Sequence, residues 1–169
     1  MEDSELKLLS PDSLSEKLKL FSDEQLLSLF NSRYTVVGDT AVEVLYERKS
    51  GIEMVIEALL SDKLTKKVSK IRAINFLLRF GNLPTEALNA YKYALKDKNE
   101  DVALTALFGI VFFQEIETLS HIEEWKAKYK PGDKCYEKAI KAIEALKRGN
   151  PYIFSPYYRD RKHVWGKAK

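Results

Sequence analysis

The sequence has few of the residues that metal sites and disulfides need. Cys135 is the only cysteine, and His121 and His163 are the only histidines. One cysteine cannot form an intramolecular disulfide, and a cysteine-based zinc site needs several. No second histidine or cysteine stands at metal-ligand spacing from these residues. We therefore expect no metal and no other cofactor.

Glycine motifs for catalysis are also missing. The chain contains 7 glycines, and they form neither a phosphate-binding loop nor the sharp turn that presents a catalytic serine. His121 lies beside acidic residues on a predicted helix, without a partner that would make it a general base. We therefore expect that the protein is not an enzyme.

Long apolar runs are absent as well. No stretch approaches the roughly 18 to 20 apolar residues that a membrane-spanning helix needs. Residues 1–10 do not combine a basic segment with an apolar run, as a secretion signal would. These patterns predict a cytoplasmic protein without a membrane partner.

The composition is that of a folded domain. The chain has 169 residues, of which 45% are hydrophobic and 31% charged, enough for one core without disulfides. Charge is unevenly distributed. Residues 1–60 hold 6 of the 28 Lys and Arg and 12 of the 25 Asp and Glu, a net charge of −6, which leaves +9 for residues 61–169. Such asymmetry bears on the choice of partner, although ordinary solvated helix faces would also produce it.

A short motif recurs four times at nearly constant spacing. It consists of Ala, an aliphatic residue, two variable positions and another aliphatic residue. Its alanines are Ala41, Ala73, Ala106 and Ala139, so the intervals are 32, 33 and 33 residues. Such periodicity indicates repeated supersecondary units. A small side chain in each unit allows neighbouring helices to approach closely.

Apolar residues at helical spacing predict two helices in each repeat. The first helices are expected at 23–32, 52–61, 84–96 and 117–129, and the second at 35–49, 66–80, 100–113 and 134–148. A short leading helix is expected at about 11–20. Ser22 with Gln25 and Ser50 with Glu53 have capping-box spacing, Asn99 is a candidate N-cap, and Gly149 is a candidate C-cap.

The third repeat resembles a HEAT repeat. The run from Ala94 to Val102, followed by Ala106 and Leu107, has the Asp turn, Val and downstream Ala-Leu of that family. Asp62 and Asp133 occupy comparable turns, whereas Ala103 replaces the usual Arg and the first repeat lacks the Asp turn. The resemblance to a divergent member of the HEAT/armadillo superfamily covers about 22–149.

This resemblance implies an all-α fold: a right-handed solenoid of about four antiparallel helix pairs, at 23–49, 52–80, 84–113 and 117–148. With the leading helix they would form one domain over 1–149. The superfamily identifies a fold and not an activity. HEAT-like DNA glycosylases use a concave set of Trp, Asp and Arg, but Trp125 on a first helix and Trp165 in the tail do not match that set.

The repeat register predicts which side chains point outward on the second helices. At about 100° per residue, the positions one before, two after and six after each Ala lie opposite the buried side. HEAT-like stacks line their concave groove with this side. It would hold the candidate partner-binding residues Glu43, Glu47, Arg72, Asn75, Arg79, Phe108, Phe112 and Lys141.

Three of the candidate residues are carboxylates with like charge. Asp39, Glu43 and Glu47 are spaced four residues apart, an arrangement that costs an isolated helix a few tenths of a kcal/mol per pair. Such a strip would bind a basic partner, such as the cleft of a nuclease. An ordinary solvated face near Arg48 is the alternative.

Two aromatic residues stand one turn apart in the third repeat. Phe108 and Phe112 would be apolar anchors of an interface, with Arg72 and Arg79 as charged neighbours. The alternative is that both phenylalanines are covered by the C-terminal tail or by a tightly curved stack, because 100–113 is apolar on nearly all sides.

The tail, residues 150–169, breaks the repeat pattern. It interleaves basic residues with aromatic ones such as Tyr157, Tyr158 and Trp165. That mixture is found in nucleic-acid-binding segments, but a cap that packs on the last repeat has the same composition.

Two functions agree with these patterns. The first is a monomeric protein-binding module, which resembles in kind and size the immunity proteins of bacterial contact-dependent and other polymorphic toxin systems. It would bind a toxin domain, such as a nuclease, and block its active site. The second is a HEAT-like protein that binds nucleic acid through its basic C-terminal half, and a general interaction scaffold remains a third alternative.

Overall fold

The computed structural model describes residues 3–61, 63–80 and 85–155 of the chain. They divide into two compact units, residues 1–77 and 78–169. The described residues form α-helices and 3-10 helices and contain no strand, so the predicted all-α class is confirmed. The prediction of one domain over 1–149 stays a prediction.

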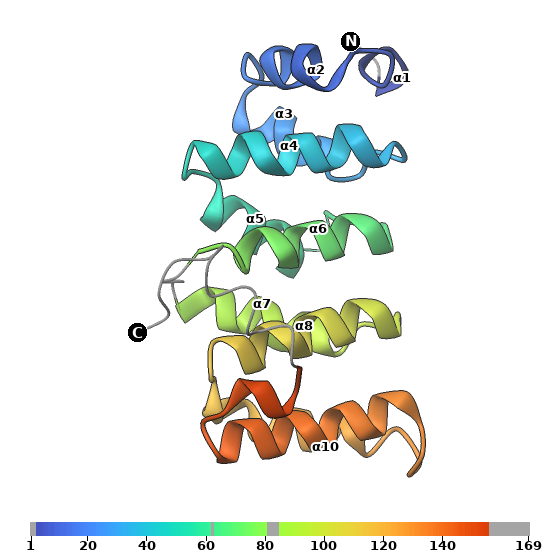
Figure 1. Ribbon diagram of the computed structural model, residues 1–169, viewed down its shortest axis with the longest axis vertical. Helices are drawn as coiled ribbons and strands as arrows, with labels where there is room; N and C mark the ends of the chain where they lie inside the picture. The colour runs from blue at the N-terminus through green and yellow to red at the C-terminus, as the bar shows by residue number, and fades with distance from the viewer. Residues whose placement is uncertain (1–2, 62, 81–84, 156–169) are drawn as a thin grey trace. The chain divides into compact units, whose positions relative to one another are not determined.

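The described part of the first unit contains six helices. They are α1 (Asp3–Leu6), α2 (Pro11–Leu18), α3 (Asp23–Leu29), α4 (Thr35–Glu47), α5 (Ile52–Leu60) and α6 (Lys67–Leu77). In Figure 1, α4 lies between α2 and α6, and it contacts both. Helix α3 packs on α4, and α5 packs on α6. The single turn of α1 was not predicted, because four residues are too few to show helical periodicity.

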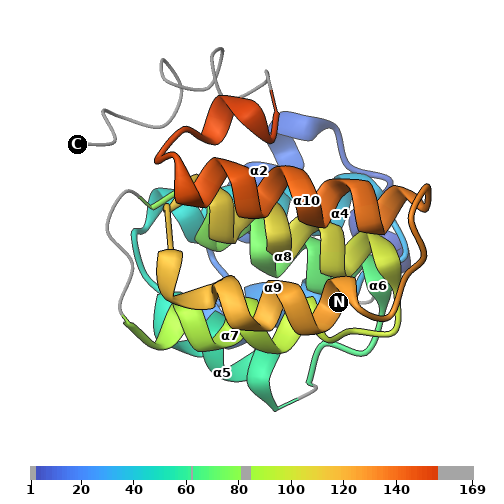
Figure 2. The same cartoon turned by 90° about the horizontal axis from the view of Figure 1, so that it is seen from below.

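The second unit contains α7 (Thr85–Leu95), α8 (Glu100–Phe112), α9 (Leu119–Lys126) and α10 (Lys134–Lys147). Two 3-10 helices accompany them, η1 (Ile116–Thr118) and η2 (Pro151–Ile153). Helix α8 packs on α7 and α10, while α9 packs on α10 and α7. Figure 2 shows α8 and α10 on one side of this unit and α7 and α9 on the other. Each of the eight helical ranges predicted from periodicity therefore contains a helix.

Local signals explain several helix ends. The Ser22 hydroxyl accepts a hydrogen bond from the Gln25 backbone N–H, and the Gln25 side chain accepts one from the Ser22 N–H. Asn99 caps α8 by accepting from the N–H of Asp101, and Gly149 ends α10 with φ +59°. The predicted cap at Ser50 is wrong. Gly51, at φ +80°, is the N-cap of α5, and no side chain caps that helix.

The repeated alanines lie in the cores of the two units. Ala41, Ala73, Ala106 and Ala139 have no exposed surface, as the repeat predicted. Their close packing allows α4 to contact α6 and α8 to contact α10. Ile140, the residue after Ala139, is nevertheless 39% exposed. No further α-helix follows α10 in the described residues to cover it.

None of the described helices is both long and apolar enough to cross a membrane. The described residues also contain no group of three or more His, Cys, Asp or Glu side chains that could hold a metal ion.

Candidate partner-binding surface

Helix α4 carries the predicted acidic strip, which consists of Asp39, Glu43 and Glu47. All three residues are exposed, while the opposite side of α4 is buried through Val37, Ala41 and other apolar residues. The helix therefore presents its carboxylates to solvent because the repeat register turns its apolar side inward.

Lys19 is affected by the charge at the C-terminal end of the strip. The pKa of Lys19 is raised, chiefly by its hydrogen bond to Glu16 and by the charge of that carboxylate, while the charge of Glu47 adds to the effect. Lys19 Nζ lies 2.7 Å from Glu16 Oε1. The residue after α2 thus places a cation, paired with Glu16, near this end of the strip.

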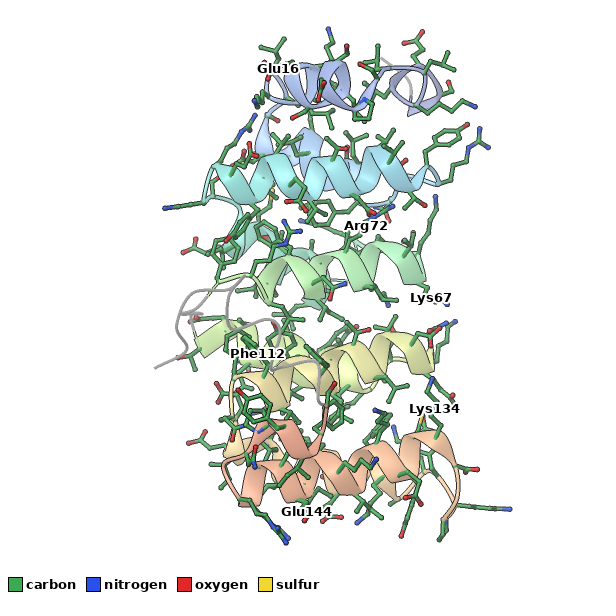
Figure 3. The ribbon with its side chains drawn as sticks, in the orientation of Figure 1. Glu16, Lys67, Arg72, Phe112, Lys134 and Glu144 are labelled. Atoms are coloured by element: carbon green, nitrogen blue, oxygen red, sulfur yellow. The ribbon has the colours of Figure 1, made fainter. Side chains whose placement is uncertain are left out.

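Asp39 has a partner that the sequence did not indicate. Its Oδ1 accepts a hydrogen bond from Arg72 Nε at 2.8 Å. The Asp39 side chain remains 57% exposed, whereas that of Arg72 is 6% exposed. Figure 3 shows Arg72 on α6 pointing toward α4. The structure therefore brings two candidate residues together, one facing solvent and one in the interior of the first unit.

The expectation that Arg72 points outward is wrong. Its guanidinium donates to the backbone oxygens of Phe30 and Ser32 at 2.9 and 3.0 Å, and to that of Thr35 at 3.2 Å. The position before the Ala lies at the flank of the buried side, where α4 packs on α6. A long side chain there reaches the end of α3, whose last carbonyls lack partners within the helix. Arg72 therefore stabilises the fold and is not available as a contact.

Gly38 makes room for this guanidinium. A β-carbon on Gly38 would lie 2.2 Å from Arg72 Cζ and 2.3 Å from Nη1. Since real side chains do not approach so closely, any larger residue at position 38 would displace Arg72. The pair could not be found from the sequence, because nothing in a helical pattern links a glycine to an arginine one repeat away.

The remaining candidate residues differ in exposure. Asn75 on α6 and Lys141 on α10 are exposed. Arg79, Phe108 and Phe112 are half-buried. Asn75 belongs to the first unit, and the other four to the second.

Phe108 is partly covered by the segment that follows α10. Its ring makes an edge contact with Phe154, with centroids 6.3 Å apart, and Phe154 is only 5% exposed. Lys138 Nζ lies over the Phe154 ring, 5.1 Å from its centroid. Residues 151–153 pack on α10. Phe108 is thus part of the packing between α8 and this segment, which is the alternative that the sequence left open.

Phe112 packs differently. Its ring lies 5.0 Å from that of Phe113 in an edge arrangement, and Phe113 lies 6.1 Å from Tyr91. Residues 156–169, with the basic part of the tail, lie outside the described residues.

The first unit also holds a group of cations that the sequence analysis missed. Two cations contact the ring of Tyr34: Lys7 Nζ lies 4.6 Å from its centroid and Arg33 Cζ 4.8 Å from it. Lys66 Nζ donates to the backbone oxygen of Asn31 in the same turn. One signal could have found part of the group: Arg33 and Lys66 stand at nearly the same place in consecutive repeats, just before a second helix.

We compared the chain with models of known protein families, with curated proteins and with solved structures, and none of them matches.

Proposed function

We propose that the protein is a HEAT-like, right-handed solenoid whose second helices form a binding surface for a protein partner. Support comes from the order of contacts within each unit. Within the units α3 packs on α4, α5 on α6, α7 on α8 and α9 on α10, and the second helices also contact each other, α4 with α6 and α8 with α10. Stacked helix pairs of this kind bury one side of each second helix and leave another side for recognition.

One observation carries the proposal. The residue two after the motif Ala is never fully buried, and it differs in chemistry from repeat to repeat: Glu43, Asn75, Phe108 and Lys141. The motif Ala itself is buried in each repeat. A constant buried position beside a variable accessible one is expected where the fold is repeated and the surface is specialised for a partner.

The acidic strip on α4 favours a basic partner. Glu43 and Glu47 are exposed and lie four residues apart, and like charges at this spacing repel one another. Asp39, by contrast, pairs with Arg72. A basic partner would relieve this repulsion and would be steered to the strip by charge. Catalytic clefts that bind nucleic acid are basic because they contact phosphates.

We therefore propose an immunity protein that binds a bacterial toxin domain, such as a nuclease, and blocks its active site in the cytoplasm. The acidic strip would occupy the cleft where phosphates otherwise bind. Asn75, in the same unit, would add a contact. Arg72 is excluded from this set because its guanidinium is buried and fully used within the first unit.

The proposal expects a toxin gene directly upstream of the gene for this chain, and the test is a titration of the purified toxin domain that this gene would encode. Calorimetry should give one molecule of the protein per toxin domain, and nuclease activity should fall to zero at that ratio. The variant Glu43→Lys/Glu47→Lys should bind more slowly, with an association rate lower by roughly tenfold or more at low salt. Glu53→Lys, at an exposed residue of α5, is the control. Full activity of the toxin domain at excess protein would refute the proposal.

A further inference from the structure

The Lys7, Arg33, Tyr34 and Lys66 side chains form a second charged surface in the first unit, here called the basic edge. They come from three separate places: the residue after α1, the turn between α3 and α4, and the turn before α6. Tyr34 joins the first two through its ring contacts with Lys7 and Arg33. Arg33 Nη2 also donates to the Tyr34 hydroxyl at 2.6 Å.

The basic edge is fixed by the buried framework beneath it. Arg72 holds the backbone oxygens of Phe30, Ser32 and Thr35, and Lys66 Nζ holds that of Asn31 at 2.7 Å. The turn that carries Arg33 and Tyr34 is therefore attached to α6 on both sides of position 33. A surface held in this way loses little conformational entropy when a partner binds.

Positive charge in this place is not neutralised within the described part of the chain. Lys19, Arg48 and Lys63 of the same unit each pair with a carboxylate. Lys7, Arg33 and Lys66 have no such pair among the described residues. The first turns of α4 and α6 also contain no acidic residue. Bringing like charges together costs energy that an anionic partner would offset.

The positive charge of the basic edge affects the pKa of the Tyr34 phenol. Desolvation alone would raise its pKa, but the hydrogen bonds and charges of Lys7 and Arg33 lower the pKa below its ordinary value. The positive potential therefore prevails at the centre of the basic edge.

The geometry points to a carboxylate-rich polypeptide segment as the ligand of the basic edge. Proteins that bind single-stranded nucleic acid present aromatic rings on which bases stack, whereas the Tyr34 ring already lies close to the two cations. The acidic strip begins at Asp39 on α4, the helix that follows Tyr34. It would repel a long polyanion that extended along α4, but a short acidic segment can avoid it.

This inference goes beyond the toxin-inhibitor proposal, because it concerns a surface of opposite charge. If the acidic strip binds nothing, the basic edge can still bind an acidic segment. The converse also holds, so each proposal can fail alone.

Fluorescence anisotropy with a labelled octaglutamate peptide tests the inference on the full chain. Wild-type protein should bind the peptide with an affinity that falls as salt is added. The variant Lys7→Glu/Arg33→Glu should bind at least about fivefold more weakly. The control Lys17→Glu/Lys147→Glu, which makes the same change of net charge at exposed residues, should remain within about twofold of wild type.

Circular dichroism must show that each variant is folded, and Lys7→Gln/Arg33→Gln replaces the first variant if that one is not. Equal losses in the control, or no binding by wild type, would overturn the inference. A 16-residue oligothymidylate provides the second arm. If it binds more tightly than the peptide and loses that affinity in Lys7→Glu/Arg33→Glu, the basic edge is a nucleic-acid surface and the assignment to an acidic polypeptide is wrong.

Discussion

The Arg72 guanidinium occupies the space that a β-carbon on Gly38 would need, 2.2 Å from Cζ. The first unit thereby connects α6 to α4 and to the end of α3 through one side chain. Gly38 lies in the interior of α4, where glycine is less favourable than alanine by roughly 1 kcal/mol. Glycine at position 38 is therefore explained by the space that Arg72 needs, although its helix propensity is low.

The effect of Gly38→Ala should depend on Arg72. In the wild-type background we expect a loss of about 2 to 4 kcal/mol of unfolding free energy, because the displaced guanidinium leaves buried carbonyls without donors. In the Arg72→Ala background the same substitution should be neutral or stabilising by up to about 1 kcal/mol, since only helix propensity remains. Urea denaturation of the four proteins measures both effects. Equal effects in the two backgrounds would show that the residues do not interact.

Tyr91 should be replaceable by Phe with a gain in stability. The residue is 1% exposed, and its hydroxyl has no hydrogen-bond partner in the described part of the chain. Removing a buried polar group of this kind should stabilise the fold by about 1 kcal/mol. Thermal or urea denaturation at pH 7 provides the measurement. A loss of stability in Tyr91→Phe would mean that the hydroxyl is bonded after all.

The same tyrosine predicts a pH effect with a definite sign. Desolvation raises the pKa of Tyr91 in the folded protein. Above about pH 10 the unfolded chain therefore releases this proton while the folded protein keeps it, and stability falls by about 1.4 kcal/mol per pH unit for this group. Tyr91→Phe should lose stability less steeply between pH 10 and 11. Lysines titrate in the same range, so the informative quantity is the difference between the two slopes.

Phe108 and Phe154 should be energetically coupled. Their rings make an edge contact at 6.3 Å, so a double-mutant cycle with Phe108→Ala and Phe154→Ala should give a coupling of about 0.5 to 1.5 kcal/mol. Each single variant should be destabilised by about 2 to 4 kcal/mol. Additive losses would indicate that the segment after α10 does not hold Phe108 in place.

How far the sequence predicts this structure depends on the range of the interaction concerned. The apolar periodicity around Ala41 and Ala73 predicts two helices and their buried sides, because residues three or four apart lie on the same side of a helix. The exposure of Glu43 follows from the same register. The outward direction predicted for the Arg72 side chain is wrong. A long side chain at the border of the buried side can turn inward when neighbouring segments offer backbone carbonyl groups. No periodicity contains that information.

The basic edge escaped prediction for a related reason. Lys7, Arg33 and Lys66 are far apart in the sequence and belong to turns, whose conformation the repeat does not fix. Lys7 and Arg33 both contact the ring of Tyr34, and Lys66 donates a hydrogen bond to the backbone oxygen of Asn31. Local patterns predict the helices here, while tertiary contacts assemble the surface.

A growth assay tests the central claim, inhibition of a toxin domain through the acidic strip, most directly. Bacteria that express the upstream-encoded toxin domain are grown with this protein, with Glu43→Lys/Glu47→Lys, or with the Glu53→Lys control, at equal protein levels. We predict that wild type and Glu53→Lys restore growth and that Glu43→Lys/Glu47→Lys, although folded, does not. Absence of rescue by the wild-type protein, or full rescue by Glu43→Lys/Glu47→Lys, would contradict the account.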